Sequence, residues 1–336
     1  MRCPDCSHNQ KYRDGMRCGK CGYQFICRKK SDGISDHTLR HLIGRLSDNG
    51  QQAFTMTQLT LELCRYWRRK TARNLIGGLI FYAIITALIA FVAGHWTIPV
   101  ILLIILSLLT VWSAQRQKTT LPLPRARKLI DRYHQAHRIT ALADGRAFLQ
   151  PTTADNPQDL QYAPERILLV ERDDLVDMLV RNRFHATHKT AVVSRSGYPK
   201  SVFEACQTFL RRYPATPVQL LHDASLQGFN LKAQLAADPQ WSLAGPSLVD
   251  LGLSQEAIKN AARLPWLPAN NRHKGVLSTE YAKMLSAGHR VPIDCMGPKP
   301  LLNLLGAALI GGLLLLPTPS ASGDIAAEFG VEDDFG

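Results

Sequence analysis

The strongest hydrophobic pattern in the first half of the chain is a pair of uncharged apolar runs. Residues 75–93 contain no charged side chain, and a second uncharged run covers residues 98–114 after a short turn. A helix needs about 20 apolar residues to cross a membrane. The pattern therefore predicts two transmembrane helices, paired as a hairpin, over residues 75–114.

The basic residues around these runs predict an orientation. Lys and Arg crowd residues 65–73 before the first run and residues 116–128 after the second, and the short turn between the runs has none. Positive residues favour the cytoplasmic side of a membrane. We therefore expect a multi-pass protein of the cell membrane, in contact with the lipid bilayer, with its N-terminus and main soluble domain in the cytoplasm.

A third apolar run covers residues 301–316, between Pro300 and Pro317. Its small residues Ala307, Ala308, Gly311 and Gly312 are spaced as in helices that pack closely in lipid. The run predicts a third transmembrane helix over residues 301–317, and a re-entrant or buried helix is the alternative. The tail at residues 318–336 has acidic residues and no Lys or Arg, which favours an external position.

Between the N-terminus and the first apolar run, residues 32–70 show helical periodicity. Leu39, Leu42 and Leu46 are spaced to share one helix face. The segment is predicted to be a helical spacer, with a winged-helix-like unit as the alternative.

Residues 120–300 alternate between short apolar runs and amphipathic stretches. Apolar runs at residues 167–170, 191–194 and 218–221 predict strands, and residues 200–212 predict one of the intervening helices. Such alternation favours a parallel sheet with crossover helices. The predicted fold class is thus a multi-domain membrane protein with an N-terminal metal knuckle, a helical hairpin and a cytoplasmic α/β domain.

The charge balance suggests a class of partner. The chain has 40 Lys and Arg against 27 Asp and Glu, a formal charge of +13. An excess of this size suits nucleic acid, a phosphorylated ligand or an anionic lipid surface. Cytoplasmic segments of membrane proteins are also rich in Lys and Arg, so the charge alone leaves both explanations open.

Four cysteines near the N-terminus form two CxxC pairs, Cys3 with Cys6 and Cys18 with Cys21. Two such pairs direct four sulfurs at one ion, a spacing typical of structural zinc sites. Two disulfides or a redox-active CxxC are the alternatives, but no signal peptide precedes the motif and disulfides need an oxidising compartment. The segment resembles the zinc-ribbon family, so residues 1–28 are predicted to hold Zn²⁺. Three roles stay open for this knuckle: it binds nucleic acid, it binds a protein partner, or it only caps the segment that follows.

Polar residues follow the predicted strands of the α/β domain. Glu171 ends the first strand, Arg195 and Gly197 form a turn after the second, and Asp223 ends the third. Ligands of parallel sheets bind beyond the carboxyl ends of the strands. Two carboxylates at this edge can hold Mg²⁺ and leave coordination positions for phosphate oxygens.

In residues 165–262 the chain resembles a Toprim domain of the topoisomerase VI A-subunit and Wadjet nuclease-subunit type. The matching residues are Glu171, the Gly197-Tyr198-Pro199 turn, Asp223 with Gly228, and the segment that starts at Asp250. The resemblance implies Mg²⁺ at Glu171 and Asp223, with Gly197, Ser225 and Arg195 contacting substrate. Ser225 replaces the second Asp of the family motif, and no tyrosine matches the cleaving tyrosine of the topoisomerase.

Two functions follow from these observations. In the first, a degenerate Toprim-like domain binds a phosphate-bearing ligand or nucleic acid and acts as a sensor or scaffold. In the second, the domain is an Mg²⁺-dependent, phosphodiester-cleaving enzyme with a role in defence or DNA maintenance. The loss of the second Asp at Ser225 favours the first function.

Overall fold

A computed structural model describes residues 1–93, 122–149, 164–241, 248–254, 265, 267–268, 285 and 288–312. The chain divides into two compact units. Unit 1 comprises residues 1–44 and 59–139, and unit 2 comprises residues 45–58 and 140–336.

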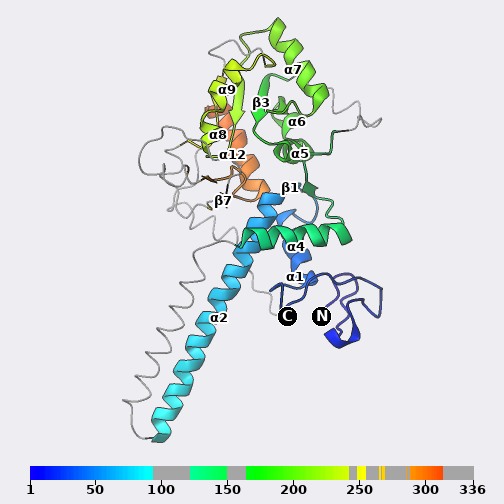
Figure 1. Ribbon diagram of the computed structural model, residues 1–336, viewed down its shortest axis with the longest axis vertical. Coiled ribbons are helices and arrows are strands. Elements are labelled where there is room, and N and C mark those ends of the chain that lie inside the picture. The colour runs from blue at the N-terminus through cyan, green and yellow to red at the C-terminus, as the bar shows by residue number, and fades with distance from the viewer. Residues whose placement is uncertain are drawn as a thin grey trace. The chain divides into compact units, whose positions relative to one another are not determined.

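Unit 1 combines an irregular N-terminal segment with helices. Residues 1–28 contain the short 3-10 helix η1 (Tyr12–Asp14) and two isolated antiparallel bridges, Arg2 with Asn9 and Arg17 with Gln24. The helices are most of α1 (Asp36–Leu46) and α2 (Met56–Ala93), and all of α4 (Leu123–Ala136). α4 begins with Pro124 in its first turn, where a missing backbone N–H costs nothing. Figure 1 shows α2 as one continuous helix.

Unit 2 is built around a four-stranded parallel sheet with the strand order β4-β3-β5-β6. The strands are β3 (Arg166–Val170), β4 (Thr190–Ser194), β5 (Val218–Leu221) and β6 (Leu248–Asp250). The central strand β3 pairs Leu168 with Val192 on β4 and with Gln219 on β5. The predicted α/β architecture with a parallel sheet is confirmed.

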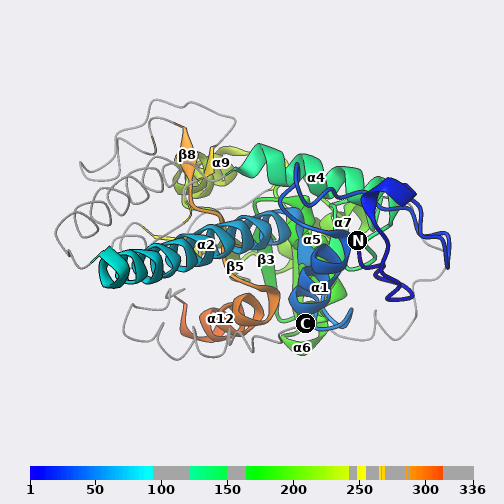
Figure 2. The same cartoon turned by 90° about the horizontal axis from the view of Figure 1, so that it is seen from below.

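Side chains of the sheet alternate between two apolar layers, as the period of a strand requires. Leu168 and Val170 face a core that includes α5 (Asp173–Arg181) and α12 (Pro298–Gly311). Ile167 and Leu169 face a second core that includes α7 (Lys200–Arg212) and α9 (Leu231–Ala237). Helices therefore cover both faces of the sheet (Figure 2), which is why apolar residues predominate in its strands.

Smaller elements complete unit 2. They are α6 (Phe184–Thr187), α8 (Leu226–Phe229), the parallel pair β1 (Phe54–Thr55) with β2 (Leu142–Ala143), and the antiparallel pair β7 (Leu267–Pro268) with β8 (His289–Arg290). The chain after β8 crosses back to the sheet edge, where Ala224 and Val291 form an antiparallel bridge.

The predicted membrane architecture is wrong. In the part of the chain that the structure describes, no helix is long and apolar enough to cross a membrane. The first apolar run does not form a helix of its own. It continues α2, whose first turns at Leu59 and Leu63 are buried and whose middle carries the basic cluster from Arg65 to Arg73. This finding also contradicts the predicted multi-pass location at the cell membrane.

The third apolar run also has a different role. α12 has 14 residues, and Leu301, Leu305 and Ala308 are buried in the core beneath the sheet. The amide of Gln219 on β5 donates to the carbonyl oxygen of Leu309 at 3.2 Å. The described part of the run, residues 301–312, thus belongs to a core helix and its C-cap, and a buried helix was the alternative that the sequence left open. The second predicted span (residues 98–114) and the acidic tail (residues 318–336) lie outside the described residues.

Candidate functional site

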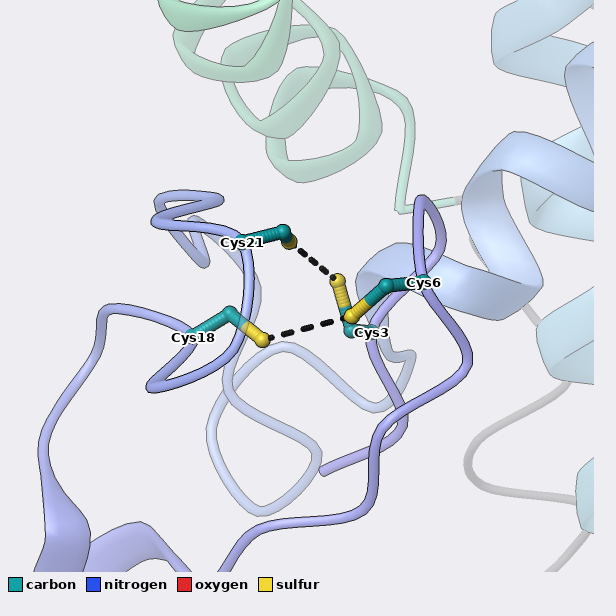
Figure 3. A group of neighbouring side chains, drawn as sticks. All are labelled: Cys3, Cys6, Cys18 and Cys21. Carbon is teal, nitrogen blue, oxygen red and sulfur yellow. Dashed lines mark hydrogen bonds between the residues drawn. The ribbon is translucent and has the colours of Figure 1, made fainter.

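The four N-terminal cysteines converge in unit 1, as Figure 3 shows. The Sγ atoms of Cys3 and Cys21 lie 3.5 Å apart, and those of Cys6 and Cys18 lie 3.6 Å apart. All four sulfurs lie within 4.8 Å of one another. Sulfurs around a tetrahedral ion with bonds of about 2.3 Å would be roughly 3.8 Å apart, so the four thiols can hold a metal ion such as zinc.

Two turns with the same hydrogen bonds present these sulfurs. In the first, the amide of Cys3 donates to the carbonyl oxygen of His8, and the amide of Ser7 donates to that of Cys3. In the second, Cys18 donates to Tyr23 and Gly22 donates to Cys18. Ser7 and Gly22 both have positive φ, at 56° and 77°. Glycine adopts such a φ without steric cost, whereas no feature of the sequence marks Ser7 for this position.

The sulfur distances exclude disulfides in this structure. A disulfide needs an S–S length of about 2.05 Å, and all eight cysteines are free. The backbone N–H of Cys21 lowers the pKa of Cys18 to about 6. Although backbone hydrogen bonds oppose both shifts, burial and neighbouring sulfurs raise the pKa values of Cys6 and Cys21. A thiolate is the form that binds metal, so Cys18 is the thiol of these three that ionises most readily.

Gln10 ties the two turns together, a role that the CxxC spacing does not reveal. Its side-chain amide donates to the carbonyl oxygens of Gly15 and Arg17, and its oxygen accepts from the amide of Gly19. One neutral side chain thus satisfies three backbone groups beside the second CxxC pair.

A buried polar network connects the cysteine segment to the helices of unit 1. Asp36, at the start of α1, accepts hydrogen bonds from the amides of Ile26 and Cys27. The hydroxyl of Tyr23 bonds to Asp36 and to the hydroxyl of Tyr133 on α4, both at 3.4 Å. Burial raises the pKa of Asp36. Tyr133 is therefore a buried structural residue in this network.

In unit 2, Glu171 and Asp223 do come together at the carboxyl edge of the sheet. The amide of Asp223 donates to Oε2 of Glu171 at 2.9 Å, and the amide of Glu171 donates to the carbonyl oxygen of Leu221 at 3.0 Å. Burial raises the pKa of Glu171, and the nearby Asp223 carboxylate raises it further. The structure thus places the two predicted acids side by side on neighbouring strands.

Both oxygens of the Asp223 carboxylate already have protein partners. Oδ1 accepts from the amide of Ile293 at 2.8 Å, and Oδ2 is paired with the guanidinium of Arg290. The side chain of Asp223 is completely buried. Arg290 and Ile293 come from a segment far along the chain, so sequence inspection of the strand ends did not find them.

A second set of ion pairs lies at the same edge. Arg172, directly after Glu171, has a guanidinium nitrogen 2.8 Å from Oδ1 of Asp294 and another 3.4 Å from Oδ1 of Asp174. The other oxygen of Asp294 accepts from the hydroxyl of Thr55. Burial raises the pKa of Asp174 to about 6, although Arg172 opposes the shift.

His222 pairs with the last acid of the edge. Its Nε2 lies 3.0 Å from Oδ1 of Asp250, and its Nδ1 lies 2.8 Å from the carbonyl oxygen of Asp223. Burial opposes the charged form, but Asp250 prevails and the pKa of His222 is raised. Gly252 leaves room for this ring, because a Cβ there would lie 2.2 Å from Nε2.

The three residues predicted to contact substrate have local roles. Ser225 caps α8, accepting from the amide of Gly228 at 2.9 Å. Gly197 adopts a φ of 81° in the turn after β4. The amide of Arg195 donates to the carbonyl oxygen of Val170, which ties that turn to β3. The Ser225 hydroxyl therefore acts as the N-cap of α8.

The edge does not fit an Mg²⁺ ion in the arrangement described. Mg²⁺ binds to free carboxylate oxygens at about 2.1 Å, and the carboxylate of Asp223 has both oxygens occupied by Arg290 and Ile293. Within the described residues, only the four N-terminal cysteines form a group of three or more side chains placed to hold a metal.

The two units differ sharply in charge. Unit 1 has 21 Lys and Arg against 6 Asp and Glu, whereas unit 2 has 19 against 21. Within the cysteine segment, Arg2, Lys11, Arg17 and Lys20 are exposed to solvent. The whole positive excess of the chain therefore belongs to unit 1, which contains the four clustered cysteines.

Comparison with known proteins adds no relative. No protein-family model, no curated protein and no solved structure matches the chain. What is established is a four-cysteine cluster that can hold a metal ion and an α/β domain with a parallel sheet.

Proposed function

We propose that this protein binds nucleic acid through unit 1, with a structural zinc ion at Cys3, Cys6, Cys18 and Cys21. The α/β unit, which resembles a degenerate Toprim domain, then acts as a sensor or scaffold. The observation that carries this proposal is the charge partition, 21 basic against 6 acidic residues in unit 1. A segment with so large a positive excess attracts phosphates and releases their counterions.

Zinc fits the four thiols better than other divalent cations do. Four cysteines in two CxxC turns are typical of structural zinc, and hard cations such as Mg²⁺ and Ca²⁺ prefer oxygen ligands. Four thiolates complete the tetrahedral coordination of zinc and leave no open position for a substrate or water, so the ion would hold the fold together. Metal analysis of the purified full chain should give one zinc per protein.

The exposed basic residues of the cysteine segment are the proposed contacts to phosphate. Arg2, Lys11, Arg17 and Lys20 are all exposed. Their charges lie on a segment that the metal makes rigid, and rigid presentation reduces the entropy lost on binding. Contacts of this type fix a backbone without reading base sequence.

The test is oligonucleotide binding by the full chain with two matched variants. The first replaces Arg2, Lys11, Arg17 and Lys20 with Gln, and the second replaces four exposed basic residues of unit 2 with Gln, namely Lys200, Arg211, Arg212 and Lys232. Four lost phosphate contacts should weaken binding by roughly 100-fold or more at low salt. The unit 2 variant should bind within about two-fold of wild type. Equal losses in both variants would refute the proposal.

The metal-dependent nuclease is the second candidate, and one observation favours it. Glu171 and Asp223 lie together at the sheet edge, joined by a 2.9 Å hydrogen bond. The pairing of Asp223 with Arg290 opposes it. Cleavage of DNA or RNA by wild type in Mg²⁺, abolished by Glu171→Ala in a folded protein, would favour this candidate over the scaffold.

A further inference from the structure

The carboxyl edge of the sheet in unit 2 is crossed by residues 289–296, here called the edge strap. The strap is fixed at the edge by its own backbone. The amide of Ala224 donates to the carbonyl oxygen of Val291 at 2.9 Å, and the reverse bond measures 3.0 Å. This two-bond bridge places the side chains at either end of the strap next to the residues that follow β3 and β5.

The strap supplies one charge of each sign. Arg290 pairs with Asp223, which follows β5, and Asp294 pairs with Arg172, which follows β3. The side chains of Asp223 and Asp294 are completely buried, and those of Arg290 and Arg172 are 24% and 18% exposed. Each buried acid of the edge thus receives its countercharge across the strap contact.

We propose that Arg290 takes the place of a divalent cation at this edge, so that the α/β unit is independent of metal. An acid that is fully buried needs a nearby positive charge, whether from a metal ion or from a basic side chain. The guanidinium on Oδ2 and the Ile293 amide on Oδ1 together provide what the carboxylate needs. Glu171 accepts a hydrogen bond from the amide of Asp223. Protein groups thus contact the acids of this edge in the places that a metal ion and its water ligands would otherwise take.

Arg290, Asp223 and Glu171 all belong to unit 2, so this role of Arg290 does not depend on nucleic-acid binding by unit 1. It also gives a physical reason why Asp223, which resembles a Toprim metal ligand, need not bind Mg²⁺, because its charge is already balanced by a residue outside the resembling segment.

The test is the response of thermal unfolding to Mg²⁺ and Mn²⁺ in the full, zinc-loaded chain. Wild type should show no shift in the unfolding of unit 2 at millimolar metal. Arg290→Ala leaves Asp223 buried without a countercharge, so it should unfold at a lower temperature and regain stability when metal is added. A ligand at about 100 times its dissociation constant should raise the midpoint by roughly 5–10 °C in a unit of this size.

Two further variants make the result decisive. The double variant Asp223→Asn with Arg290→Met removes both charges, so it should recover part of the lost stability and ignore metal. Arg290→Lys retains the positive charge and should also ignore metal. If Arg290→Ala fails to fold, Arg290→Gln removes the charge with a smaller loss of side-chain volume and should respond to metal in its place. The proposal is overturned if wild type binds Mg²⁺ and Asp223→Asn abolishes that binding, or if folded Arg290→Ala does not respond to metal.

Discussion

The cysteine segment of unit 1 and the sheet of unit 2 are held together in different ways. The cysteine segment buries a small cluster of Cys3, Cys18, Tyr23 and Phe25. Two apolar layers enclose the sheet, and each layer contains at least a dozen buried side chains. A segment with so little apolar burial needs another source of stability, and a metal ion held by the four cysteines would supply it. The sheet has an ordinary hydrophobic core and needs none.

The largest effect should come from removing the metal ligands. Cys18→Ser takes away one of four sulfurs, and structural zinc contributes about 10 kcal/mol or more to the folding of such segments. We expect loss of bound zinc and rapid proteolysis within residues 1–28, while the unfolding midpoint of unit 2 stays unchanged. Cys206→Ser, at a buried thiol of α7 outside the cluster, is the control that should retain zinc. A cysteine segment that stays folded without metal would contradict the inference that this segment depends on a metal ion for its stability.

The next effect concerns the apolar layers of unit 2. Leu168 on β3 is completely buried. Leu168→Ala should lower the free energy of unfolding by about 2–5 kcal/mol, because it removes apolar contacts and leaves a cavity. Leu149→Ala, at a side chain that is 64% exposed, should change it by less than about 0.5 kcal/mol. Urea unfolding monitored on unit 2 measures both, and zinc content should be equal in the two proteins.

A smaller effect should appear in the dependence of stability on pH. The pKa of Asp174 is raised to about 6 by burial. Because the folded state holds this proton more tightly than the unfolded state, stability from Asp174 is fully present below pH about 4 and falls as the pH rises to about 6. Asp174→Asn removes this dependence, so the variant should gain up to about 3 kcal/mol relative to wild type between pH 4 and 7. A constant difference across that range would show that Asp174 does not titrate as proposed.

The smallest predicted effect tests whether Ser225 is a helix cap or a ligand contact. The Ser225 hydroxyl accepts from the amide of Gly228 at the start of α8. Ser225→Ala should cost about 1 kcal/mol of stability, and Ser225→Asp should cost less because Asp is also a good cap. Neither variant should alter oligonucleotide affinity. A loss of binding by Ser225→Ala with unchanged stability would assign Ser225 to a ligand site.

Sequence patterns predicted the elements that depend on local spacing. The CxxC pairs predicted the cysteine cluster, and short apolar runs predicted β3, β4 and β5 within a residue of their ends. The parallel arrangement of these strands was predicted from their alternation with helices. The amino-acid sequence alone was therefore enough to locate the cluster and the sheet edge, down to the approach of Glu171 to Asp223.

The errors came from contacts between distant residues. Apolar length alone suggested that residues 301–316 cross a membrane, whereas Leu301 and Leu305 pack beneath the sheet. For the same reason, the sequence did not predict the pairing of Arg290 with Asp223, which lies 67 residues away. Gln10 and Asp36 carry no motif, because a single polar side chain that bonds to backbone groups leaves no periodic signal.

The central claim is that the basic charge of unit 1 binds nucleic acid. Its most direct test is the slope of log affinity against log salt for a single-stranded oligonucleotide, measured for wild type and for the variant with Gln at Arg2, Lys11, Arg17 and Lys20. Each phosphate contact contributes about 0.7 to this slope. The account predicts that the slope becomes shallower by roughly 2–3 units in the variant, with zinc content unchanged. An unchanged slope, or no salt-dependent binding by wild type, would contradict it.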